Sequence, residues 1–213
     1  MPVRVDRRRE QRKANKLSIE RSGESMAQSE KERTPKYCFT GETKSYQHRT
    51  LYRIQACRAF GTVKAGEVGG WIEKQENLSH EDTCWVSDEA IVCDDAWVHG
   101  HAQIQKWAKV RDQAEVYGYV VVSDFAIVSE HARLTQRAEV FDHAKVKGCA
   151  VTSDFARIQD YAEISGQAWV YQYAVVGGWE QIGGRERIIS DSLHKKHFQR
   201  KLQFWTEREQ FFY

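Results

Sequence analysis

The sequence lacks the long apolar runs of membrane-spanning and exported proteins. No stretch approaches the ~18 consecutive apolar residues that a bilayer-spanning helix needs. The N-terminus is basic, but no apolar core of roughly 7–15 residues follows it, so the sequence predicts no secretory signal peptide. We therefore expect a soluble protein of the cytoplasm.

Cysteines with the spacing of a metal site or a disulfide framework are also missing. The chain has five cysteines, an odd number, and no two of them form a C-x-x-C pair. This pattern is typical of a reducing compartment and gives no zinc signal. The sequence therefore predicts no metal and no cofactor.

A strong excess of one charge is absent as well, because the net charge is only +2. The charges are unevenly placed: residues 1–36 hold 11 Lys/Arg against 6 Asp/Glu, whereas residues 84–179 hold 8 against 13. Binding along a nucleic acid needs a basic track. The acidic stretch therefore argues against nucleic acid as a partner, except through a basic arm at residues 1–35.

What the chain does have is a repeat with a period of six, from Cys84 to Trp179. Sixteen hexads follow one another without an inserted or deleted residue. Position one is Ala in fourteen hexads, position three is Val, Ile or Leu in fifteen, with Thr152 the exception, and position five is Asp or Gly in twelve. A fixed period of this kind is typical of a solenoid of stacked coils.

Each regularity of the hexad has a physical cause. Positions one and three share parity, so in an extended segment they point to the same side, where a small residue beside a branched one fits a narrow axis. Position five turns the chain, and Gly or Asp tolerates the left-handed backbone conformation that a turn requires. A helix is excluded, because a period of six does not keep one face over turns of about 3.6 residues.

The A-x-[VI]-x-[DG]-x run resembles the left-handed β-helix of hexapeptide-repeat proteins, which have three hexads per coil. The resemblance implies an all-β fold, a single-stranded parallel β-helix of about five coils over residues 84–179. The left hand is implied by this resemblance and does not follow from the pattern itself.

A second resemblance covers the segment before the repeat. The motifs F-T-G-E-T-K at 39–44, G-G-W-I-E at 69–73 and N-L-S-H at 77–80 are similar to the leader of hexapeptide-repeat proteins that are common in tailed-phage and prophage genomes. The resemblance implies that the protein is of phage origin and acts in the cytoplasm of a bacterial host. Proteins of this kind are often classified by fold alone, so the resemblance implies an origin more than an activity.

Three flanking segments complete the predicted organisation. Residues 36–83 are expected to form a hairpin, Tyr37–Thr40 with Leu51–Phe60, and a cap in which Trp71 and Ile72 cover the first coil, because solenoids need capped ends. Residues 1–35 are expected to be a basic, disordered arm, and Met26 is an alternative native start that would place the first 25 residues outside the functional protein. Residues 180–213 are predicted to form a C-terminal helical segment, which either covers the last coil or binds a partner.

An enzymatic reading rests on family resemblance. Many left-handed β-helix enzymes are trimeric acyltransferases that use a catalytic histidine and a loop extruded from the coil. No hexad is interrupted here, and the histidines of the repeat occupy positions four and six, which face outward. The acyltransferase hypothesis therefore stays the alternative, with no catalytic residue assigned; its candidate bases are His99, His101, His131 and His143. A zinc site across a trimer interface would need a third ligand, which is not evident.

Aromatic residues gather at two corners of the predicted coil. One corner carries, at intervals of eighteen residues, Glu89 and then Trp107, Phe125, His143, Tyr161 and Trp179. The second carries His101, Tyr119, Arg137, Phe155 and Tyr173, and the third is polar: Asp95, Gln113, His131, Cys149 and Gln167. Stacked rings stabilise one another, but exposed Trp, Tyr and Arg are also typical of interfaces.

These observations favour a binding protein over an enzyme. We predict that it binds or inhibits a host protein or complex, such as a defence complex, through the two aromatic corners and through Phe198 and Trp205 of the C-terminal segment. Self-association into a homo-oligomer and a structural role in the virion are the other readings of the same surface.

Overall fold

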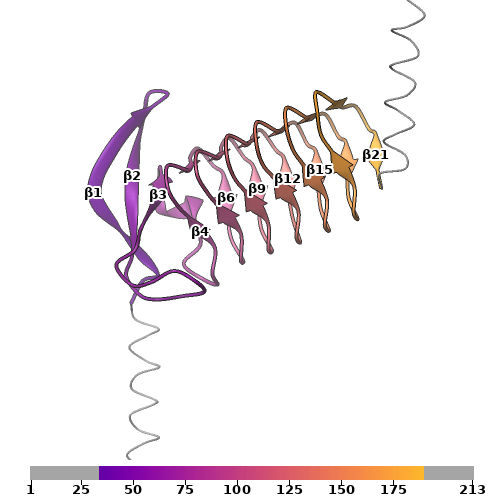
Figure 1. The fold of residues 1–213 in the computed structure, drawn as a ribbon. Helices are drawn as coiled ribbons and strands as arrows, with labels where there is room; N and C mark the ends of the chain where they lie inside the picture. The colour runs from indigo at the N-terminus through magenta and orange to yellow at the C-terminus, as the bar shows by residue number, and fades with distance from the viewer. Residues whose placement is uncertain (1–33, 190–213) are drawn as a thin grey trace, which may run out of the picture.

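A computed structural model describes residues 34–189 and shows an all-β chain. Short parallel strands stack into a solenoid of about seven turns, and the coils follow one another along one axis (Figure 1). The predicted fold class is therefore confirmed as a β-helix, although the stack is longer than the predicted five coils because β3 and β20 extend it at its two ends. Its handedness remains a prediction from the resemblance.

Three sheets form the three walls of the solenoid. The nine-stranded sheet contains, in spatial order, β1 (Tyr37–Tyr46), β2 (Arg49–Ala56), β3 (Val68–Ile72), β5 (Ile91–Val92), β8 (Lys109–Val110), β11 (Ile127–Val128), β14 (Lys145–Val146), β17 (Glu163–Ile164) and β20 (Gln181–Ile182). The β4 sheet contains β4 (Trp85–Val86), β7 (Gln103–Ile104), β10 (Val121–Val122), β13 (Glu139–Val140), β16 (Arg157–Ile158) and β19 (Val175–Val176). The β6 sheet contains β6 (Trp97–Val98), β9 (Glu115–Val116), β12 (Arg133–Leu134), β15 (Val151–Thr152), β18 (Trp169–Val170) and β21 (Arg187–Ile188).

The register of the sheets follows from the hexad. Each strand of the repeat pairs in parallel with the strand eighteen residues later, as Ile127 does with Lys145. Positions one and three of the hexads point inward: every alanine at position one is almost fully buried, and so are the aliphatic residues at position three. Because the inward column is made of such small and branched side chains, the three walls meet around a narrow axis, as predicted.

Position five turns the chain at each corner. All sixteen residues at this position between Asp88 and Gly178 have a positive φ, between 56° and 80°. Acidic side chains add a second stabilisation there, because they accept hydrogen bonds from the backbone N–H eighteen residues on. Asp112 accepts from Glu130 N–H at 3.0 Å, and Asp154 accepts from Gln172 N–H at 2.9 Å. The preference for Asp over other residues thus has a cause beyond its tolerance of the turn.

The N-terminal hairpin is longer than predicted. Strands β1 and β2 pair from Tyr37 with Ala56 to Tyr46 with Arg49, and the turn lies at Gln47 and His48, whose φ values are 46° and 65°. The first strand was predicted to end at Thr40, whereas β1 continues through the F-T-G-E-T-K motif to Tyr46. The glycine of this motif, Gly41, has a φ of 93° within β1, where the register shifts at a bulge.

The cap covers the open edge of the first coil. Strand β3 adds to β5 in parallel, with Ile72 fully buried and Trp71 N–H donating to Ala90 O at 2.9 Å. The short 3₁₀ helix η1 (Gln75–Asn77) contributes Asn77, whose amide donates to Asp94 O and Ala96 O. The expectation that Trp71 and Ile72 lie over the first coil agrees with this arrangement.

The C-terminal end of the solenoid lies beyond the predicted boundary at residue 179. Strands β20 and β21 continue the stack, although Glu180 and Glu186 replace alanine at position one. Ile182 and Ile188 at position three are still buried, so the solenoid continues with inward aliphatic residues at position three alone. The prediction of a helical segment over residues 180–213 is wrong for residues 180–189, which hold β20 and β21, because Ile182 and Ile188 keep the inward column. The rest of that segment, with Phe198 and Trp205, lies outside the described residues.

Among residues 34–189, no helix is long and apolar enough to cross a membrane.

Candidate functional site

The first aromatic ladder, Trp107, Phe125, His143, Tyr161 and Trp179, follows the corner between the β4 sheet and the nine-stranded sheet. Its rings stack in one continuous column, with centroid separations of 5.1, 5.0, 4.7 and 4.1 Å and interplanar angles of 4–17°. The side chains remain exposed: Trp107 is 51% exposed, Tyr161 47% and Trp179 78%. Stacking therefore holds the rings in place without burying them.

The second aromatic ladder follows the corner between the β6 and β4 sheets and differs in one respect. His101 stacks on Tyr119 at 4.4 Å and Phe155 on Tyr173 at 5.0 Å. Between these pairs lies the Arg137 guanidinium, 5.4 Å from the Tyr119 ring and 5.7 Å from the Phe155 ring. A cation between two ring faces is a favourable arrangement, so this corner alternates stacking with cation–π contacts.

A groove lies beside the first ladder, on the outer face of the nine-stranded sheet. It has a volume of about 530 Å³. Its floor is formed by position-two side chains of that sheet, its wall by the first ladder, and its N-terminal end by the hairpin. The lining residues are Lys44, Tyr46, Glu89, Ile91, Trp107, Lys109, Phe125, Ile127, His143, Lys145 and Tyr161.

Tyr46 and Lys109 join the hairpin to the floor of the groove. Tyr46 packs against a buried cluster that includes Leu51, Trp71 and Ile91, and the Lys109 ammonium lies 5.3 Å from the Tyr46 ring centroid. Apolar packing therefore helps to hold the hairpin over the sheet, and the Tyr46 ring lines the groove at this end.

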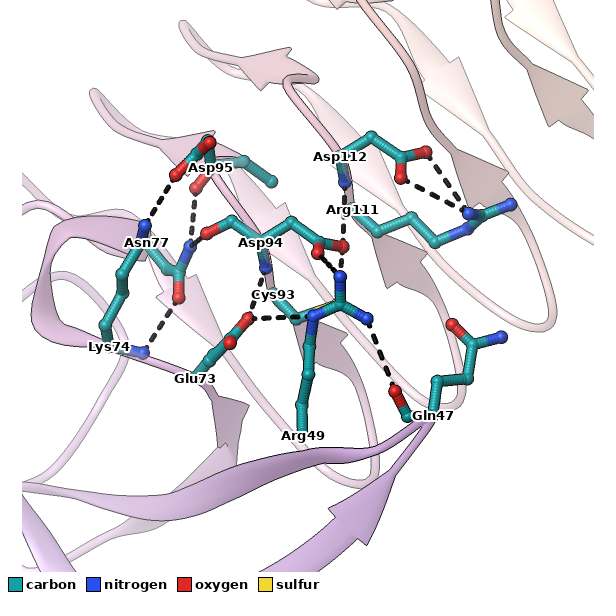
Figure 2. A network of polar contacts seen from close by, with 11 residues as sticks. Gln47, Arg49, Glu73, Lys74, Asn77, Cys93, Asp94, Asp95, Arg111 and Asp112 are labelled. Carbon is teal, nitrogen blue, oxygen red and sulfur yellow. Dashed lines mark hydrogen bonds and ion pairs between the residues drawn. The ribbon is translucent and has the colours of Figure 1, made fainter.

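Arg49, next to the turn, fixes this end of the hairpin to the first coil. Its guanidinium forms ion pairs with Glu73 and Asp94, and its other branch donates to Gln47 O at 3.4 Å (Figure 2). The Asp94 carboxylate also accepts the Asp112 N–H at 3.2 Å, which links the hairpin to the next coil. The network places the hairpin against the solenoid at a defined position.

Glu89 closes the N-terminal end of the groove. Its carboxylate accepts from Arg53 at 2.7 Å, from Lys44 at 3.1 Å and from the Trp71 indole N–H at 3.0 Å. The hydrogen bond from Arg53 is the main cause that lowers the pKa of Glu89 from 4.5 to about 2. Burial opposes this shift, and the hydrogen bonds from Lys44 and Trp71 add to it. The carboxylate is therefore ionised, and it neutralises two of the cations near the groove.

Acid will weaken this hairpin contact. Because the pKa of Glu89 is lower in the folded chain, its contribution to stability is complete above pH 4.5 and is lost as the pH falls toward 2. We expect Glu89→Gln to lower the free energy of unfolding at pH 6 by about 1 kcal/mol, the upper range for a partly exposed ionic contact. Its urea midpoint should then fall less than the wild-type midpoint between pH 4.5 and 2.5.

The matched control for this prediction is Glu139→Gln, which removes a surface ion pair with Arg157, 3.0 Å long, far along the solenoid. Hydrogen exchange of the β1 and β2 amides should rise in Glu89→Gln and stay unchanged in Glu139→Gln. Equal pH profiles for wild type and Glu89→Gln would show that this carboxylate does not hold the hairpin.

The four candidate histidines lie at separate places. His143 is in the first ladder and His101 in the second, where its Nδ1 is 2.8 Å from the Thr83 hydroxyl. His99 is stacked between Trp97 and Tyr117, with Nε2 3.3 Å from a Glu115 carboxylate oxygen. His131 lies at the polar corner. Within one protomer the structure does not bring them together, and among the described residues no group of three or more His, Cys, Asp or Glu has the arrangement of a metal site.

Sequence reasoning found the ladders but missed the groove. The missing signal was position two: residues eighteen apart on the nine-stranded sheet read Ile91, Lys109, Ile127 and Lys145, a column that forms the floor. The contribution of Lys44 and Tyr46 had no periodic signal, because it depends on how the hairpin folds back onto the sheet.

Comparison of the chain with models of protein families and with curated proteins found no match.

Proposed function

We propose that this chain is a β-helix protein of phage or prophage origin that binds a host protein complex in the bacterial cytoplasm and inhibits or redirects it. The observation that carries the proposal is the first aromatic ladder, whose rings are held rigid by stacking, stay about half exposed, and form one wall of a groove. Rigid Trp and Tyr side chains lose little conformational freedom on binding and dominate interface energetics.

The leader motifs support the phage origin. The groove supports the first-ladder corner as the face that binds the partner. Four of the eleven residues that line the groove belong to the first ladder. The second ladder, with Arg137 between its rings, would extend the contact around the β4 sheet. Phe198 and Trp205 would add to it from the C-terminal segment.

The proposal predicts that Trp107→Ser/Tyr161→Ser abolishes partner binding. The full chain would be used as bait in a bacterial lysate, and retained proteins would be identified by mass spectrometry. Loss of two central aromatic anchors typically costs about 2 kcal/mol or more each, so we expect a loss of retention well above 100-fold.

The matched control is Trp97→Ser/Tyr117→Ser, which removes a Trp and a Tyr from the stacked cluster around His99 on the β6 sheet, away from the groove. It should retain the same proteins as wild type, and circular dichroism should show both variants folded. Equal loss in the two double variants would contradict the choice of face. A wild-type chain that self-associates in sedimentation experiments while Trp107→Ser/Tyr161→Ser stays monomeric would assign the face to a homo-oligomer instead.

A further inference from the structure

We infer that the groove beside the first ladder accepts an acidic segment of the partner protein, one that carries carboxylates alongside apolar side chains. The inference rests on the proposed function and deepens it, because it assigns a chemical class to what binds at this face. Three properties of the groove support it: the orientation of its rings, the charges on its floor, and the charge of the surface around it.

The rings of the first ladder present their edges to the groove. Neighbouring planes are nearly parallel, within 4–17°, and lie 4.1–5.1 Å apart, so each inner ring is covered on its two faces by its neighbours. An aromatic ring has a negative face and a positive edge. A stacked column therefore hides the faces that attract cations and leaves the edges, which favour anions.

The floor adds positive charge. Lys109 and Lys145 alternate with Ile91 and Ile127, and among the described residues neither lysine forms an ion pair. The one carboxylate in the lining, Glu89, is already paired with Lys44 and Arg53. Lys109 and Lys145 are two coils apart, which places their backbones ~10 Å from one another. Two carboxylates at that separation would pair with both lysines, while apolar side chains would cover Ile127 and the ring edges.

This basic groove lies on an acidic solenoid. Residues 84–179 hold 13 acidic against 8 basic side chains, so the phosphates of a nucleic acid would be repelled beyond the groove. Single strands also bind through bases stacked on ring faces, which the inner rings of the ladder do not offer. An acidic protein segment requires only the local complementarity that the groove provides.

The test is zero-length cross-linking of the captured complex. A water-soluble carbodiimide joins a lysine amine to a carboxylate that touches it, with loss of one water, so mass spectrometry reads the contact directly. We expect cross-links from Lys109 or Lys145 to Asp or Glu of the retained protein. Lys109→Gln/Lys145→Gln should lower retention at least 10-fold, whereas Lys64→Gln/Arg133→Gln, which removes one exposed cation from the cap and one from the β6 sheet, should leave it unchanged.

Retention of a partner is not by itself support. If a partner is retained and is lost with Trp107→Ser/Tyr161→Ser, but Lys109 and Lys145 form no cross-links and their double variant binds as wild type, the acidic segment is excluded while the proposed function stands. If nuclease treatment releases the retained material, the occupant is a nucleic acid and the inference fails. If Trp107→Ser/Tyr161→Ser binds as well as wild type, the proposed function fails, and the inference fails with it.

Discussion

Replacing Lys36 with alanine should lower the free energy of unfolding by about 2–5 kcal/mol, the largest loss that we expect from a single substitution in the described chain. Lys36 is 1% exposed. Its ammonium donates to Cys84 O at 3.0 Å, to Glu81 O at 3.1 Å and to Cys84 Sγ at 3.1 Å. Each buried carbonyl left without a donor costs about 1–3 kcal/mol.

The position of Lys36 explains why its loss would matter so much. In the body of the solenoid, each coil offers its carbonyls to the N–H groups of the coil before it, as Ala102 O accepts from Trp85 N–H. The first coil has no such neighbour, so the cap must supply the donors, and for Cys84 O the structure uses the Lys36 ammonium. Burial lowers the pKa of Lys36, and its contact with Cys84 opposes that shift. Burial of the Lys36 ammonium is unfavourable by itself, but its hydrogen bonds satisfy carbonyl groups at the edge of the first coil.

Urea unfolding would measure the effect, with Trp85 as a reporter, because this buried indole packs edge-on against Phe60 in the cap. Lys64→Ala, an exposed lysine of the same segment, is the matched control and should change stability by less than about 0.5 kcal/mol. Lys36→Met keeps most of the stem and removes the charge, so it should lose nearly as much as alanine. A Lys36→Ala midpoint equal to that of wild type would show that the first coil does not depend on this donor.

The solenoid could be predicted from the sequence because its determinants are local and repeated. A period of six fixes which residues face inward, and Asp or Gly at position five marks twelve of the sixteen corners. With the three hexads per coil that the resemblance implies, residues eighteen apart are neighbours, and the rings of Trp107 and Phe125 stack accordingly. The same logic failed where the inward column changed. Glu180 broke the pattern of alanine and suggested an early end, although Ile182 continues the core.

The groove could not be predicted because it depends on contacts between distant segments. Nothing in the local sequence states that the hairpin folds back so that Tyr46 lies against Lys109, or that Arg53 and Lys44 meet Glu89. The sequence also predicted that the first strand ends at Thr40, although β1 continues past a bulge to Tyr46. Hairpin placement depends on apolar packing of Tyr46 and on ion pairs between residues 36–45 apart in the sequence, and a periodic pattern encodes neither.

Replacing Thr152 with valine should raise the free energy of unfolding by about 1–2 kcal/mol, the largest gain that we expect. Thr152 is the one position-three residue of the sixteen hexads that is not aliphatic, and it is fully buried. Its hydroxyl oxygen has no hydrogen-bond partner within the described chain. A buried hydroxyl without a partner costs about 1–3 kcal/mol.

Valine has nearly the same shape as threonine, so the substitution removes the polar atom without opening a cavity. Thr152 lies between Leu134 and Val170 on neighbouring coils, and valine would complete an uninterrupted aliphatic column along the β6 sheet. The matched control is Thr135→Val at position four, where the hydroxyl is partly exposed and the change should stay within about 0.5 kcal/mol. The urea midpoints of the two variants test the prediction. If Thr152→Val is neutral or destabilising, the Thr152 hydroxyl has a hydrogen-bond partner in solution, such as an internal water bound between the coils.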